Sequence, residues 1–359
     1  MSIIFKEITS MANLEKSYKQ ATKGKNKFNL EAMIYSENVT HNLKELQSNL
    51  IDGTYQFGTY NKFCVHEPKT RVIHAPQHQD KIVQHAINNV IKHIYQRCFI
   101  YDSYACIDYK GTHKAVNRVS EFMKRADWQF GPGAYIIKLD IKKYFYTINR
   151  EILKDILPKR IWCKQTLNLL YEIIDSADQI DRLGVPLGNL LSQLFANVYM
   201  NEFDQYCKRK LSIKYYVRYA DDVIAIVKNK EESLRILELM KEFFTDHLSL
   251  ETHDSKTRIF PISQGVNAYG FKIHKTHRLL RNDSKKKIKR KTKRMIISIQ
   301  ENRMSVEKCE QILNSWYGHA MHGSSYNFIN KLIKKSKYIY LDYRQRLKID
   351  VNKIYEEVI

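Results

Sequence analysis

Two adjacent acidic residues, Asp221 and Asp222, stand between two short apolar segments of the chain. The flanking segments 214–218 and 223–227 are rich in β-branched and aromatic residues, which favour β-strands. The connection between them is short enough for a tight hairpin. Neighbouring carboxylates at such a turn repel each other and lose hydration, and a divalent cation relieves both costs. The pattern predicts a metal-binding hairpin; an exposed acidic turn without function is the alternative.

A third carboxylate, Asp140, lies near the end of another apolar segment, residues 134–141. If this segment forms a strand beside the hairpin, Asp140 converges with Asp221 and Asp222. Three carboxylates can hold two Mg²⁺ ions about 3.5–4 Å apart, an arrangement suited to phosphoryl or nucleotidyl transfer. One ion would activate the attacking hydroxyl, and both would stabilise the displaced oxygens.

The composition predicts a polyanionic partner. The 359 residues allow two or three subdomains around a substantial core, and 60 Lys and Arg against 38 Asp and Glu give a net charge of +22. Nucleic acid is the first partner that such an excess suggests, and an anionic membrane is the second. The six cysteines form no Cys-x-x-Cys pair, which indicates a reducing compartment. Without a long apolar run or a signal-peptide pattern, we expect a cytoplasmic protein with no membrane partner.

Basic residues stand in several further elements. Residues 1–60 read as a basic helical extension, and segment 63–73 alternates like a hairpin. Lys69 and Arg71 are two positions apart, so in a strand they share a face and can hold a triphosphate.

The motifs resemble those of a known family. Segment 138–145, Lys-Leu-Asp-Ile-Lys-Lys-Tyr-Phe, is similar to motif A of reverse transcriptases, and Tyr219-Ala-Asp-Asp is similar to their motif C. The resemblance runs from about Lys62 to Phe271 and continues weakly beyond it. It implies an α+β right-hand polymerase in which an antiparallel sheet and helices form the palm. Residues 1–60 would be the N-terminal extension, 61–275 the fingers and palm, and 276–359 a small helical thumb.

The resemblance also assigns roles to individual residues. Asp140, Asp221 and Asp222 become catalytic ligands of two Mg²⁺ ions, with Mn²⁺ also possible and Ile141 ligating through its backbone carbonyl. The remaining roles are a steric gate at the sugar for Phe145, nucleotide clamping for Lys69 and Arg71, proton donation to pyrophosphate for Lys256, and nucleic-acid contacts for Tyr219 and for Gly270 in the primer-grip turn.

The turn at Leu187 and Gly188 is similar to that of reverse transcriptases from diversity-generating retroelements, which share an aliphatic-Gly-x-x-x-Ser-Gln pattern ending here at Gln193. An aliphatic side chain cannot hydrogen-bond nucleotide or template, and losing such restraints loosens selection. The resemblance implies that Leu187, Gly188 and Gln193 lie at the nucleotide and that copying is error-prone opposite template adenines. The resemblance also implies a small basic oligomeric accessory protein and mutagenic retrohoming.

Beyond residue 280 the chain becomes strongly cationic. Within the basic segment 285–294, the candidate nucleic-acid contacts are Lys286, Lys289, Arg290 and Lys293. A helix this basic can follow a duplex backbone, and a nuclear signal is the weaker alternative.

The sequence as a whole predicts an RNA-directed DNA polymerase that uses dNTPs and a structured template RNA and holds an RNA/cDNA duplex. Two alternatives stay open. One is a retron-like or antiphage-defence reverse transcriptase, and the other is a non-catalytic RNA-binding scaffold descended from a polymerase.

Overall fold

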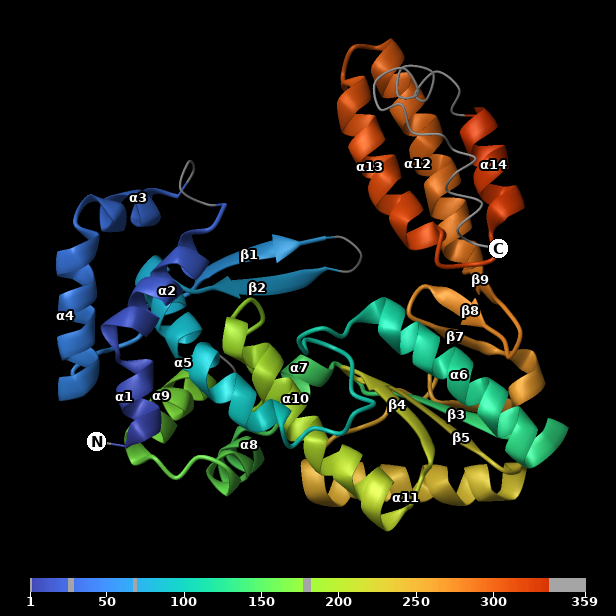
Figure 1. Ribbon diagram of the computed structural model, residues 1–359, viewed down its shortest axis with the longest axis horizontal. Helices are drawn as coiled ribbons and strands as arrows, with labels where there is room; N and C mark the ends of the chain where they lie inside the picture. The colour runs from blue at the N-terminus through green and yellow to red at the C-terminus, as the bar shows by residue number, and fades with distance from the viewer. Residues whose placement is uncertain (1, 25–28, 67–69, 177–181, 336–359) are drawn as a thin grey trace.

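The computed structural model describes residues 2–24, 29–66, 70–176 and 182–335 (Figure 1). Lys69 lies outside the described residues, as does the last part of the predicted thumb, residues 336–359. The division into units at residues 60 and 275 stays a prediction.

A four-stranded antiparallel sheet forms the centre of the molecule, and its strand order is β4-β5-β3-β6. The strands are β3 (Tyr135–Asp140), β4 (Tyr215–Tyr219), β5 (Asp222–Val227) and β6 (Arg258–Pro261). The predicted strands are confirmed, and β3 lies between β5 and β6. The α+β class with an antiparallel sheet is confirmed as well.

Helices cover both faces of this sheet (Figure 1). Helix α6 (Thr112–Phe130) packs on the face that carries Ile136 and Ile224, whereas α10 (Leu190–Gln205) and α11 (Lys230–Leu248) pack on the opposite face. Because successive side chains of a strand point to opposite faces, apolar residues at nearly every position bury both faces.

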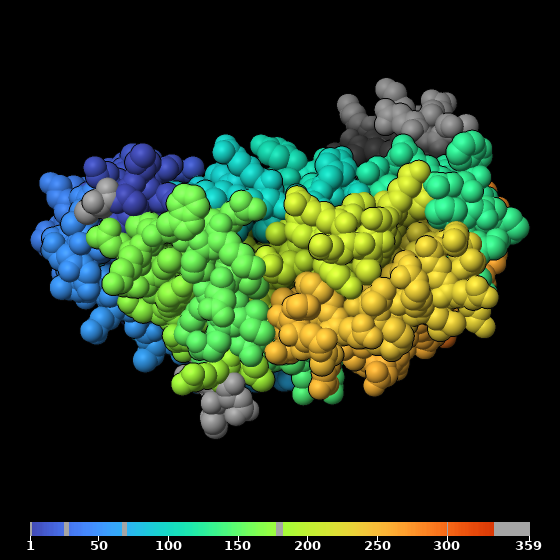
Figure 2. Space-filling view, turned by 90° about the horizontal axis from the view of Figure 1, so that it is seen from below, coloured from blue at the N-terminus to red at the C-terminus, as the bar shows by residue number. Residues whose placement is uncertain are grey.

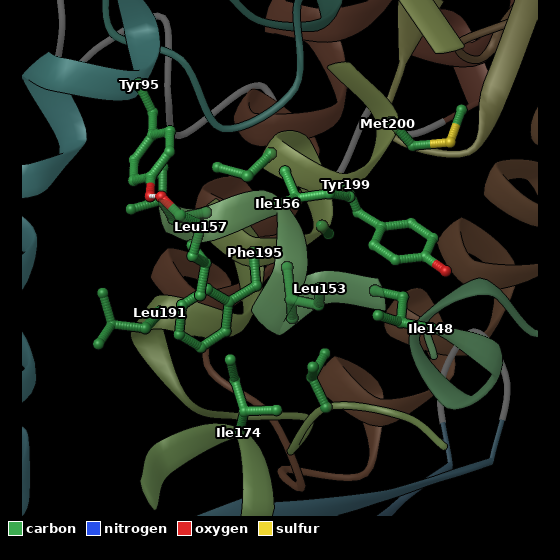
Figure 3. Close-up of a cluster of buried hydrophobic side chains, with 14 of the residues drawn as sticks. Tyr95, Ile148, Leu153, Ile156, Leu157, Ile174, Leu191, Phe195, Tyr199 and Met200 are labelled. Carbon is green, nitrogen blue, oxygen red and sulfur yellow. Dashed lines mark hydrogen bonds between the residues drawn. The ribbon is translucent and has the colours of Figure 1, made fainter. Parts of the chain in front are cut away.

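The helical side of the core is shown in Figure 3, where Leu153, Phe195 and Tyr199 meet between α8 (Arg150–Ile156) and α10. The buried Tyr95 hydroxyl donates to the Leu157 carbonyl at 2.9 Å, so it is satisfied inside an apolar cluster. Each fully buried aliphatic or aromatic side chain contributes about 1.5–3 kcal/mol to folding.

The N-terminal region is helical, as predicted. Its helices are α1 (Ile3–Ile8), α2 (Met11–Thr22), α3 (Leu30–Glu37) and α4 (Val39–Asp52), and α2 packs on α5 (His78–Gln96). Ser2, Ser10 and Asn29 cap the first three helices, and Gly53 ends α4 in a left-handed conformation.

A two-stranded hairpin projects from this region toward the C-terminal helices (Figure 1). Strands β1 (Asn61–Val65) and β2 (Arg71–Ala75) pair in antiparallel fashion, with Val65 opposite Arg71. The predicted hairpin is confirmed.

Two further helices lie between β3 and α10 in the chain, the short α7 (Tyr144–Thr147) and α9 (Lys164–Asp175).

A second antiparallel sheet links the central sheet to the C-terminal helices. It contains β7 (Val266–Ala268), β8 (Phe271–Ile273) and β9 (Arg278–Leu280). The helices that follow are α12 (Asn282–Gln300), α13 (Val306–Ala320) and α14 (Tyr326–Lys335). Among the helices in the described part of the chain, none combines the length and apolar character needed to cross a membrane.

Candidate active site

The pairing of β3 with β5 brings the predicted aspartates together. Asp140 lies directly opposite Asp222 in the register, so both side chains are on the same face of the sheet. Asp222 also pairs with Tyr219 across the β4–β5 hairpin, which leaves Ala220 and Asp221 as the turn. The carboxylates of two distant segments thus gather at one end of the central sheet.

A buried arginine holds this turn in place. Ala220 has a φ of 54°, a left-handed conformation that costs a non-glycine residue about 1–2 kcal/mol. The Arg218 side chain is fully buried, and its Nη1 donates to the Ala220 carbonyl at 3.1 Å. The buried guanidinium therefore stabilises the strained turn through this hydrogen bond.

Arg218 is neutralised by Asp204 on α10, which is also fully buried. Its Nε donates to Asp204 Oδ1 at 2.8 Å and its Nη2 donates to Asp204 Oδ2 at 2.7 Å, a two-pronged geometry. Tyr216 Oη donates to the same carboxylate at 2.6 Å, and Asn197 Oδ1 accepts from Arg218 Nη1 at 3.1 Å. The sequence analysis missed this network, although an arginine inside an otherwise apolar strand was a visible signal.

Asp221 and Asp222 lie in an environment that disfavours their charges. Burial raises the pKa of Asp222 to about 6; the nearby charge of Lys138 opposes this shift, and the charges of Asp140 and Asp221 add to it. Burial also raises the pKa of Asp221, which the charges of Lys256 and Arg71 oppose. Arg71 at the start of β2 is thus one of the charges that act on Asp221.

Two lysines approach the carboxylates directly. Lys256 Nζ donates to Asp140 Oδ1 at 2.6 Å, and Lys138 Nζ lies 3.4 Å from Asp222 Oδ1. Lys138 also donates to the Asn267 carbonyl on β7 at 2.7 Å, so it links the central sheet to the second sheet. Lys256 was predicted to lie at the site, whereas Lys138 was not.

The donor set fits a divalent cation. Carboxylate oxygens are the ligands that Mg²⁺ and Ca²⁺ prefer, and the buried Asp222 Oδ1 is approached by Lys138 Nζ at 3.4 Å without a well-formed hydrogen bond. Among the described residues, no three His, Cys, Asp or Glu side chains are yet close enough together to bind a metal ion. Lysine ammonium groups supply the positive charge instead, and a bound metal would take over that role.

The segment after Asp140 is anchored to the loop before β6. The Asp140 carbonyl accepts from the His253 backbone N–H at 2.7 Å, and Ile141 forms a β-bridge with Thr252. These contacts bring Lys256 to the aspartates. The backbone of Ile141 is therefore adjacent to the cluster, although its ligand role stays a prediction.

Phe145 is half-buried on α7 and packs edge-on against Tyr144 with ring centroids 5.6 Å apart. Its carbonyl accepts from the Val185 N–H at 2.9 Å, so Phe145 lies beside the segment that leads to Leu187 and Gly188. The structure thus brings the predicted sugar gate and the predicted nucleotide turn into one neighbourhood.

The Leu187–Gly188 turn packs against strand β2 of the β1–β2 hairpin. His74 N–H of β2 donates to the Leu187 carbonyl at 2.6 Å. Gly188 has a φ of 107°, and a Cβ built there would lie 2.7 Å from Ile73 Cγ2 and 2.9 Å from the His74 carbonyl. The turn therefore packs against protein, and its predicted nucleotide contact stays a prediction. Gln193 is exposed on α10.

Gly188→Ala will separate the hairpin from the turn, because the added methyl group requires both a left-handed backbone and space held by β2. We expect Tm to fall and the KM for dNTPs to rise, since β2, which carries Arg71, would be displaced from the turn. Gly318→Ala on α13, where a Cβ meets no atom within 4 Å, is the control. Unchanged dNTP affinity in Gly188→Ala would contradict this coupling.

The other predicted nucleic-acid residues lie on the C-terminal side of the site. The Tyr219 ring packs on the Tyr269 ring with centroids 5.2 Å apart. Gly270 lies in the β7–β8 turn, where a Cβ would be 2.7 Å from His319 Nε2 of α13. The predicted basic residues of α12 are all exposed: Lys286, Lys289, Arg290 and Lys293.

Paired carboxylates at the end of an antiparallel sheet, between a basic hairpin and a basic helical unit, define a polymerase-type nucleotidyltransferase. The chain belongs to the reverse transcriptase (RNA-dependent DNA polymerase) family, whose model matches residues 64–273. The predicted enzyme class, RNA-directed DNA polymerase, is confirmed.

Known relatives agree with this membership. Protein YkfC of Escherichia coli K12 is 27% identical over 303 residues, which cover 73% of this chain and 76% of YkfC. Group II intron-encoded protein LtrA of Lactococcus lactis is 23% identical over 303 residues, covering 64% of this chain. The match spans 49% of LtrA, about half of its length.

The fold is similar to that of telomerase from Candida albicans, solved in complex with a TWJ fragment of telomeric RNA. The TM-score is 0.55 at 10% identity, and the match covers 90% of this chain and 61% of that chain. The predicted polymerase fold is thereby confirmed.

Proposed function

We propose that the protein makes cDNA on an RNA template by nucleotidyl transfer at Asp140, Asp221 and Asp222. The observation that carries this proposal is the in-register pairing of Asp140 with Asp222, with Asp221 in the adjoining turn. These carboxylates, with the Ile141 backbone carbonyl, would hold two Mg²⁺ ions. When bound, such ions lower the pKa of the attacking hydroxyl and neutralise charge on the transferred phosphorus.

The surrounding side chains bind and orient the nucleotide. Arg71, whose charge acts on Asp221, neutralises the triphosphate together with Lys69. Lys256 already stands at Asp140 and would donate a proton to the departing pyrophosphate. Leu187, Gly188 and Gln193 complete the proposed nucleotide pocket from the turn before α10.

The primer and the product lie on the C-terminal side of the site in this proposal. Tyr219 and the Gly270 turn hold the primer end between β5 and β8. The exposed cations of α12 follow the backbone of the RNA/cDNA duplex, a contact that positions the duplex without reading its sequence.

The setting that we propose is a diversity-generating retroelement, in which a structured template RNA is copied inaccurately with a small basic oligomeric accessory protein. Leu187 supports it, because its aliphatic side chain offers no hydrogen bond to a base. The alternative is a retron-like or antiphage-defence role with the same chemistry. In both settings we expect the protein to act in the cytoplasm.

Primer extension on a mixed-sequence RNA template, followed by sequencing of the cDNA, tests the proposal. Mg²⁺-dependent product that EDTA abolishes supports the two-metal reaction. Errors concentrated opposite template adenines support the retroelement setting, whereas accurate cDNA supports the alternative. Absence of product with the native RNA and accessory protein also present would contradict the proposed activity.

Phe145→Ala should admit ribonucleotides, because removing the ring opens space beside the sugar C2′ position. We expect the ratio of dNTP to rNTP incorporation to decrease by a factor of about 10 to 100. This is the range that steric discrimination of small groups supplies. Single-nucleotide incorporation with each substrate measures the ratio. Phe243→Ala is the control, since that ring stacks on Tyr206 with centroids 4.3 Å apart, outside the site. An unchanged ratio in Phe145→Ala would rule out the gate.

A further inference from the structure

A hollow lies at the C-terminal end of α10, the end that is far from the Leu187–Gly188 turn. We call it the underside hollow. Its walls are the end of α5, the loop that follows it, the 3₁₀ turn Leu157–Lys159, and the π-helical turn Tyr206–Lys210. Figure 2 shows the face on which the green α8 region and the yellow-green end of α10 lie side by side. Since α10 spans Leu190–Gln205 at about 1.5 Å per residue, the hollow is about 20 Å from the Gly188 turn.

The hollow is strongly cationic. Its basic lining residues are Arg97, Lys159, Arg160, Lys208 and Arg209, and Glu202 is the one acidic residue among those that line it within the described chain. Glu202 is already paired with Lys159 at 2.7 Å. Within the described residues, Arg97, Arg160 and Arg209 have no ion-pair partner, and all three are exposed.

Lys208 is fixed at the base of the hollow. Its Nζ donates to the Ile213 carbonyl at 3.1 Å and to the Lys214 carbonyl at 3.0 Å. Partial burial lowers its pKa, so the charged form lacks solvation that an anion would restore.

Helix dipoles alone do not account for this cluster. Cations near the C-terminal ends of α5 and α10 are favourable, which explains Arg97 and Arg209. Arg160 ends the 3₁₀ turn that continues α8, so it also stands at a helix C-terminus. Dipoles explain each arginine by itself but not why three separate helix ends converge on one hollow. Three unpaired guanidinium groups around one concavity match the bidentate geometry of phosphate oxygens.

An exposed aromatic ring completes the hollow. Tyr101 is 72% exposed, and the Lys110 amino group and the Arg118 guanidinium lie 4.8 Å and 5.3 Å from its ring centroid. An exposed ring at the edge of a cationic hollow offers a stacking surface for an unpaired base.

We propose that the underside hollow binds RNA, with Arg97, Arg160 and Arg209 on backbone phosphates and Tyr101 on an unpaired base. The occupant is a folded part of the template RNA that is not being copied, so the enzyme retains its template at a second point. The choice of template RNA rests on the proposed function; the binding of RNA itself does not.

The test compares two triple variants with equal change of charge. The variant R97E/R160E/R209E reverses the charge of the hollow's three unpaired cations. The control K228E/K230E/R235E reverses three exposed cations just before and in the first turns of α11. Affinity for a long RNA with hairpins and loops is measured without dNTPs over a range of salt concentrations. Extension of a short primer–template is measured separately.

We expect the hollow variant to bind the structured RNA at least about tenfold more weakly, with a salt slope smaller by about 2–3, because three phosphate contacts are lost. Short primer–template extension should stay within about twofold of wild type. Tyr101→Ala should weaken binding of looped RNA and leave binding of blunt duplex RNA unchanged. The neutral variant R97Q/R160Q/R209Q should show the same effects more weakly, which excludes misfolding caused by the introduced acids.

Equal losses in both triple variants would overturn the proposal, because net charge alone would then explain them. Unchanged RNA affinity would also overturn it and would leave an acidic protein as the occupant. RNA binding is read without catalysis, so an inactive wild-type enzyme would contradict the proposed polymerase function without affecting this result.

Discussion

Asp222→Asn abolishes cDNA synthesis, with an expected loss of about 10³-fold or more, and leaves RNA affinity within about twofold of wild type. The amide keeps the shape of the side chain but removes the negative charge that we propose binds the metal ions. Primer extension in Mg²⁺ and a binding assay without dNTPs give the two values. Asp254→Asn, an exposed acid on the neighbouring loop, is the control and should retain activity.

The same substitution should stabilise the metal-free protein. The pKa of Asp222 is raised to about 6 from an ordinary 3.8, so its carboxyl favours folding when protonated and opposes it when ionised. That contribution is fully present below about pH 4 and is lost as pH rises through about 6. We expect Tm in EDTA at pH 8 to rise by about 2–4 °C in Asp222→Asn, with no difference at pH 4. Retained polymerisation or a lower Tm at pH 8 would remove Asp222 from the proposed metal site.

Asp204→Asn should destabilise the protein by about 3–5 kcal/mol, because it leaves the Arg218 guanidinium buried without a countercharge. Denaturant unfolding measures this change. Cysteine and hydroxyl groups around the pair do not supply a replacement charge. Glu238→Gln, which breaks an exposed pair with Lys241, should change stability by less than about 1 kcal/mol and serves as the control.

The double variant D204L/R218M separates stability from function. Replacing a buried ion pair with apolar side chains is often neutral or stabilising, so most of the lost stability should return. The hydrogen bond from Arg218 to the Ala220 carbonyl does not return, and the strained turn loses its support. We therefore expect a folded protein with poor synthesis. Full activity in the double variant would show that Arg218 does not position the turn.

Local patterns in the sequence were sufficient to predict the main elements of the site. Alternation and β-branched residues predicted β3, β4 and β5, and the short connection predicted the hairpin turn, because both depend on nearby residues alone. The placement of β3 beside β5 followed from the chemical requirement that the acids converge. The resemblance to reverse transcriptases then supplied the overall architecture.

The parts that the sequence did not reveal depend on contacts between distant segments. Asp204 pairs with Arg218 only because α10 lies under the sheet, and Lys138 reaches Asn267 only because β7 crosses near β3. Leu187 was interpreted from its inability to hydrogen-bond through its side chain, yet its backbone carbonyl makes the contact with β2. No periodicity in the chain reports such pairings.

The order of strands in the central sheet has a consequence for biosynthesis. Strand β3 lies between β5 and β6, which are made much later in the chain. A nascent polypeptide that ends before β5 therefore carries Asp140 on a strand with both edges unpaired, and such edges invite aggregation. Asp140 can pair with Asp222 only after the ribosome has made β5, so a nascent chain that stops earlier cannot assemble the carboxylate cluster.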